Sequence, residues 1–138
     1  MLTRLALVLL MAPQFIPRPV EDPSGRYFGL KQVGSDPYGY ESVEFSLTSK
    51  ATKVPVVWAR RDQSGERERR ELLFEDLKVD VDGLSAVVRG KRPASIPSKW
   101  KGKFVSKAPP ANAKGAVVPG LLLDGDWFLQ VGDLEDTL

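Results

Sequence analysis

Residues 72–88 read LLFEDLKVDVDGLSAVV, and this stretch decides the fold. Apolar residues alternate along 77–81 and again along 84–88, with Asp82-Gly83 between the two runs. Asp-Gly in that setting predicts a two-residue type I′ turn, because such a turn needs a positive φ at both central positions. The predicted register pairs Val81 with Leu84, Val79 with Ala86 and Leu77 with Val88. We therefore expect an antiparallel hairpin with one apolar face and one mostly polar face.

Several other stretches show the period-2 pattern of strands. In Tyr40–Leu47, Val43, Phe45 and Leu47 share one face, and further strands are expected at 26–33, 54–60, 103–107, 117–123 and 126–131. The parity changes between 74 and 77, which predicts a β-bulge near Glu75-Asp76. In the last hairpin both faces are apolar, and the predicted faces are Leu121, Leu123 and Phe128 on one side and Leu122, Trp127 and Leu129 on the other.

Seven to nine short strands predict an all-β fold. We expect a small, mostly antiparallel barrel or sandwich, with the strands in an up-and-down meander of the kind that lipocalin-like barrels show. This is a likeness of pattern, since no family motif is matched. The charged run 60–71 is expected to be a solvated hairpin with its tip at Ser64-Gly65.

The N-terminal residues predict export. Arg4 is followed by the apolar run LALVLLMA at 5–12, which fits a signal-peptide-like leader with a poor cleavage site and is too short to span a membrane. Four prolines in 13–24 predict an extended linker. A single β domain is then expected over 25–132, followed by an acidic tail over 133–138, and the protein is expected to be secreted or periplasmic.

The composition argues against catalysis. The chain has no cysteine and no histidine, so it lacks the commonest thiol nucleophile, the commonest general base and the commonest transition-metal ligand. No catalytic motif is present, and we predict neither an enzyme, nor a cofactor, nor a metal site.

A basic stretch supplies the candidate site. Between residues 83 and 123 there are eight basic residues and no acidic one. Pro93 and Pro97 predict a loop over 90–102. The candidate binding residues are Lys99, Trp100, Lys101 and Lys103. Lysines neutralise anionic groups, and an exposed indole stacks on a ring of the ligand; the opposing interpretation is that Trp100 plugs the barrel.

Three functions follow as hypotheses. The first is a non-catalytic binding or envelope-associated module for an anionic polymer. The second is a carrier of a small apolar ligand, with Phe45, Trp58, Val79 and Phe128 lining a cavity. The third is a cytosolic nucleic-acid-binding barrel, which requires that the leader belong to the fold.

Overall fold

The computed structural model describes residues 14–32, 39–48, 50–62, 64–109, 115–124 and 127–132. These residues form nine strands joined by turns, with no helix among them. The strands are β1 (Gln14–Pro17), β2 (Gly25–Gln32), β3 (Tyr40–Leu47), β4 (Val54–Arg61), β5 (Arg67–Val79), β6 (Gly83–Arg89), β7 (Lys99–Ala108), β8 (Val118–Leu123) and β9 (Trp127–Gly132).

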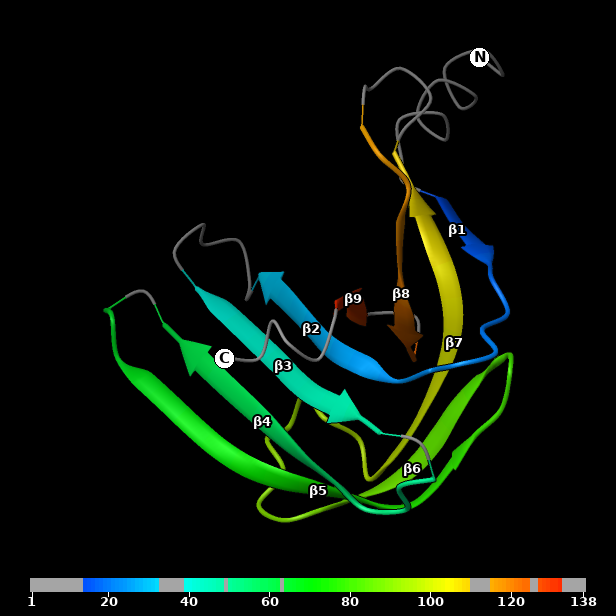
Figure 1. Ribbon diagram of the computed structural model, residues 1–138. Coiled ribbons are helices and arrows are strands. Elements are labelled where there is room, and N and C mark those ends of the chain that lie inside the picture. Colours follow the sequence, from blue (N-terminus) through cyan, green and yellow to red (C-terminus); the bar gives the residue numbers. More distant parts are fainter. Residues whose placement is uncertain are drawn as a thin grey trace, which may run out of the picture.

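The strands close into a barrel (Figure 1). Each strand from β2 to β9 pairs antiparallel with the next in sequence, and β9 returns to pair with β2. The short strand β1 lies outside this ring and pairs with the C-terminal end of β7. The predicted all-β barrel of seven to nine strands in meander order is confirmed. Closure gives each of the eight barrel strands a partner strand on both sides, which reduces the exposed edge available for edge-to-edge aggregation.

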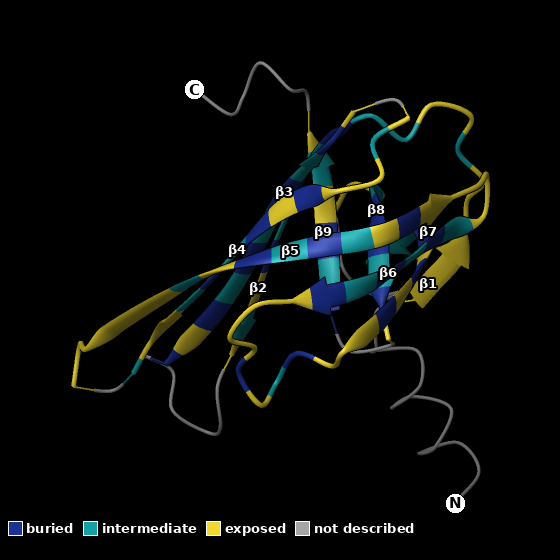
Figure 2. Ribbon diagram, turned by 90° about the horizontal axis from the view of Figure 1, so that it is seen from below, coloured by how far each residue is buried: buried dark blue, intermediate teal, exposed yellow. Residues whose placement is uncertain are grey.

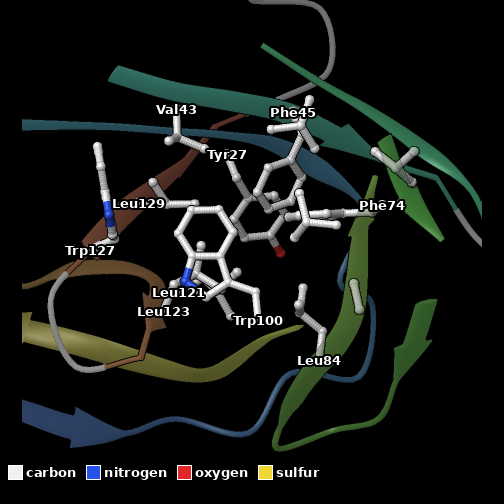
Figure 3. Close-up of a cluster of buried hydrophobic side chains, with 14 of the residues drawn as sticks. Tyr27, Val43, Phe45, Phe74, Leu84, Trp100, Leu121, Leu123, Trp127 and Leu129 are labelled. Atoms are coloured by element: carbon white, nitrogen blue, oxygen red, sulfur yellow. The ribbon is translucent and has the colours of Figure 1, made fainter. Parts of the chain in front are cut away.

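Aromatic side chains fill the interior of the barrel. Figure 3 shows Tyr27, Phe45, Phe74 and Trp100 gathered between the strands. The rings form a chain of contacts, with centroids 5.3 Å apart for Tyr27 and Phe45, 5.0 Å for Phe45 and Phe74, and 6.0 Å for Phe74 and Trp100. Trp127 continues the chain from Trp100 at 6.3 Å in an edge-to-face arrangement. Such pairs stabilise a core beyond the area that they bury.

The central hairpin exists, but its predicted register is wrong. Val79 pairs with Leu84 and Lys78 with Ser85, so the strands are displaced by two residues from the prediction. The turn is stabilised by a side chain: one carboxylate oxygen of Asp80 accepts the backbone N–H groups of Asp82 at 2.8 Å and Gly83 at 2.9 Å. A displacement of two keeps the parity of the strands, because the side-chain period of a strand is two, so Leu77, Leu84, Ala86 and Val88 are buried as predicted. Val79 and Val81 were predicted on the same buried face but are 36% and 48% exposed, because they lie at the turn end of the hairpin.

The predicted bulge is confirmed. The register of β5 and β6 shifts between Glu75 and Lys78, and Asp76 has a φ of 50°. Asparagine and aspartate tolerate this left-handed region better than most residues. The extra residue returns Leu77 to the interior after Phe74.

Strand β7 begins earlier than predicted. It starts at Lys99, within the stretch 90–102 that the prolines marked as a loop. The remaining loop before β7 packs against the barrel. Ile96 is fully buried, and the Ser95 hydroxyl donates to the Glu41 carboxylate of β3 at 2.8 Å. The prolines therefore limit the loop to the residues before β7.

The faces predicted for the last hairpin also need correction. Leu121 pairs with Leu129, Leu122 with Phe128 and Leu123 with Trp127. Paired residues share a face, so Trp127 and Leu129 point inward with Leu121 and Leu123, while Phe128 points outward with Leu122. The cause is an odd number of residues between the strands, which reverses the parity expected from an Asp-Gly turn.

Part of the proline-rich stretch 13–24 is tied to the barrel. The strand β1 pairs with β7, and the Val20 N–H donates to the Val81 carbonyl at 2.8 Å. The Tyr27 hydroxyl, at one end of the core, donates to the Pro23 carbonyl at 2.7 Å. Burial, with the charge of Asp22 nearby, raises the pKa of Tyr27 to about 12, so this phenol stays protonated at neutral pH. These contacts are more than a solvated linker would make.

Gly83 tests how closely β6 approaches β7. A Cβ at Gly83 would lie 2.0 Å from the Gly102 carbonyl oxygen, so Gly83→Ala forces the strands apart. We expect a loss of about 1–3 kcal/mol in the free energy of unfolding, measured by urea denaturation. The control is Gly115→Ala, whose Cβ would make an ordinary 3.5 Å contact with Pro109. An equal effect of the two substitutions would contradict the close approach.

Candidate functional site

Three lysines form a row on the outer face of β7. Lys99, Lys101 and Lys103 are exposed, while the intervening Trp100 and Gly102 are buried. Alternate residues of a strand lie about 7 Å apart on one face, so the ammonium groups repeat at that spacing. We call these three residues the lysine row. Three of the four predicted site residues thus form one surface.

Trp100 is not part of that surface. Its side chain points into the barrel and is 1% exposed, in contact with Phe74 and Trp127 (Figure 3). Strand alternation explains the separation, because a residue between two outward-facing lysines must face inward. The interpretation of Trp100 as a plug is the one that agrees with this geometry, and a role in stacking on a surface ligand does not.

The lysine row borders a groove on the outside of β5–β8. The groove has a volume of about 690 Å³, and its basic and hydroxyl residues are Lys78, Ser85, Lys101 and Lys103. Ser85 pairs with Lys78 on one side and with Lys101 on the other, so these three side chains form a line across the strands. Since neighbouring strands are about 4.8 Å apart, the two lysines flank the serine hydroxyl. We call this the lysine groove.

Sequence analysis missed two residues of the lysine groove. Its register placed Ser85 opposite Asp80, and Lys78 opposite a valine, whereas the two residues face each other. One signal could have corrected the register. An aspartate side chain readily accepts hydrogen bonds from the backbone N–H groups two or three residues later, so Asp80 favours a turn that starts at Asp80.

The lysines and the carboxylates of the lysine groove differ in the partners that they already have. None of Lys78, Lys99, Lys101 and Lys103 forms a salt bridge with a described carboxylate. In contrast, two of the three carboxylates on the rim already accept backbone N–H groups: Asp80 within its turn, and Asp124 from Lys101 at 3.4 Å. The ammonium groups are therefore the side-chain donors that the groove offers to a ligand, while Asp80, Asp82 and Asp124 keep their negative charges at its rim.

The residues predicted to line a carrier cavity are not brought together. Phe45 and Trp58 are buried in the core, whereas Val79 is 36% exposed at the end of β5. Phe128 faces outward, with its ring centroid 5.6 Å from that of Phe15. Instead of a shared cavity, aromatic rings occupy the space between Phe45 and Trp127.

The described residues include no group of three or more histidine, cysteine, aspartate or glutamate side chains that could hold a metal ion. In the same part of the chain, no helix is long and apolar enough to cross a membrane. Comparison of the chain with protein-family models, with curated proteins and with solved structures gives no match.

Replacing Trp100 separates a core role from a surface role. Trp100→Ala is expected to lower the free energy of unfolding by about 3–5 kcal/mol, because it opens a cavity among packed rings. Trp100→Phe should be milder, since it keeps an aromatic ring and removes an indole N–H that has no partner in the described structure. Lys101→Ala, at an exposed position, should stay within about 0.5 kcal/mol of wild type. Unchanged melting of Trp100→Ala would contradict the buried position.

Proposed function

We propose that this protein is a non-catalytic binding module that recognises an anionic polymer through the lysine row and the lysine groove. The observation that carries the proposal is the line Lys78–Ser85–Lys101, in which two lysines without salt bridges flank a hydroxyl. An anionic group seated between them accepts hydrogen bonds from both ammonium groups and from the serine.

The extent of the lysine row favours a polymer over a single small anion. Lys99 and Lys103 are four residues apart on β7, so the row covers about 13 Å. A chain of sulfate, phosphate or carboxylate groups laid along β7 meets a cation at each alternate residue. Because the barrel is closed and its core is packed, the backbone that carries the row is rigid, and binding orders the lysine side chains but not the strand.

The compartment decides which polymer is relevant. We propose that residues 1–12, with the apolar run at 5–12, are an export leader, so that the ligand is an anionic polymer of the envelope or the extracellular space. The first described strand, β1, starts at Gln14, and removal of residues 1–12 would leave every described strand intact. If the leader is retained in the cytosol, the same lysines would instead meet nucleic acid.

The salt dependence of binding tests the proposed function. Heparin and single-stranded DNA serve as probes, titrated at two ionic strengths and followed by fluorescence anisotropy. Each neutralised charge releases counterions, so wild-type affinity should fall steeply with salt. Replacing Lys78, Lys101 and Lys103 with glutamine should weaken binding and reduce the slope of log K against log salt by about 2 for single-stranded DNA.

The matched control replaces Arg61, Arg67 and Arg69 with glutamine. It removes the same number of charges from the outer ends of β4 and β5, which the lysine groove does not include. If both triple variants lose affinity equally, binding depends on net charge alone and the proposed site is wrong. Absence of salt-dependent binding in the wild type would remove the polymer proposal altogether.

Export has its own test. Mass spectrometry of protein recovered from the secreted or periplasmic fraction should find an N-terminus after Ala12, ahead of β1. Recovery of the intact chain from the cytosol alone would contradict export and favour the nucleic-acid ligand.

A further inference from the structure

A second groove lies on the outside of β2–β5, apart from the lysine groove. Cross-strand pairing aligns Leu30, Ser42, Ala59 and Arg69 in one row and Tyr40, Arg61 and Arg67 in the next. The groove has a volume of about 440 Å³. We call it the arginine groove and define it by Leu30, Tyr40, Ala59, Arg61, Arg67 and Arg69. Figure 2 shows the exposed end of the β4–β5 hairpin, which carries its arginines, projecting beyond the barrel.

The two walls of the arginine groove differ in chemistry. Leu30 and Tyr40 form the less polar wall and are 62% and 44% exposed, so both side chains can contact an occupant. The opposite wall carries the three arginines, and the floor between them is the small Ala59. An occupant must therefore combine anionic groups with an apolar group placed on one side of them.

The arginines are available for such an occupant. Arg61 and Arg67 form no salt bridge with a described carboxylate, and Arg69 has only a long, exposed contact of 3.5 Å with Glu71. The acidic residues that border the groove are already engaged: Glu68 pairs with Arg70, and Glu41 accepts from Ser95. The net charge offered to a partner is positive.

The spacing of the arginines matches an extended peptide. Arg67 and Arg69 lie on one face of β5, two residues and about 7 Å apart. Alternate side chains of an extended segment repeat at the same distance, and each guanidinium can donate two parallel N–H hydrogen bonds to one carboxylate. Arginine and tyrosine are enriched at protein interfaces and lysine is depleted, and the groove is lined by no described lysine.

We propose that the arginine groove docks an extended acidic segment of a partner protein. Carboxylates at alternate positions bind Arg67 and Arg69, and an apolar side chain of the segment packs on Leu30 and Tyr40. This proposal does not depend on the ligand of the lysine row. The two surfaces have different chemistry. The lysine row presents ammonium groups, whereas the arginine groove presents planar guanidinium groups beside an apolar wall, which suits a ligand with both carboxylates and an apolar side chain.

The test uses a fluorescent peptide with glutamate at alternate positions and one leucine, titrated with the full chain by anisotropy. Arg67→Gln combined with Arg69→Gln should weaken binding by about tenfold or more, because it removes charge-assisted hydrogen bonds. Leu30→Ser should also weaken binding, and its position at the surface keeps the fold intact. A peptide with lysine in place of glutamate should not bind.

The triple lysine variant is the matched control and should lose less affinity for the acidic peptide than the double arginine variant does, because the lysine row offers the peptide no apolar wall. The proposal is overturned if the peptide fails to bind, or if the lysine and arginine variants lose affinity equally. It is also overturned if single-stranded DNA displaces the peptide in an arginine-dependent way, because the groove then belongs to nucleic acid. Melting temperatures of all variants, matched to wild type, show that lost affinity is not lost folding.

Discussion

The closed pairing of β7 is the constraint on which the rest of the structure depends. Its two edges pair with β6 and β8, and its C-terminal end also pairs with β1; Figure 1 shows β7 in yellow, between β8 and β1. From Lys99 to Phe104 the side chains of β7 alternate between solvent and core, because successive side chains of a strand point to opposite faces. Trp100 and Phe104 are thereby held in the aromatic interior, and the lysines between them are held outside. One backbone arrangement produces both the core and the basic surface.

The same alternation explains why this barrel presents its candidate sites on the outside. Aromatic rings in mutual contact, from Tyr27 through Trp100, occupy the inward positions. The interior therefore stabilises the barrel, and these rings fill the space in which a ligand could lie. Outward positions are free to differ from one sector of the barrel to another. Lysines without ion pairs gather over β5–β7, while arginines and exposed apolar side chains gather over β2–β5. The two sectors therefore present different donor groups to the solvent.

The sequence was sufficient for those parts of the fold that depend on local alternation. The strand Tyr40–Leu47, the bulge near Asp76 and the all-β class follow from the period-2 pattern. Pairing register does not, because it depends on the turn: Asp80 caps its own turn instead of leaving Asp82-Gly83 to form one. The candidate site shows the same limit. The charge pattern identifies Lys101 and Lys103, but Lys78, Ser85 and the arginine groove arise from cross-strand neighbours, which only the register brings together.

The central claim is that the lysines on the outside of β5 and β7 act as one binding surface. Lysine acetylation, quantified by mass spectrometry with and without heparin, tests it residue by residue in the intact chain. The account predicts that heparin protects Lys78, Lys99, Lys101 and Lys103, while Lys50 and Lys53 in the β3–β4 loop react as they do in the free protein. Equal protection of all these lysines, or protection of Lys50 and Lys53 alone, would contradict it.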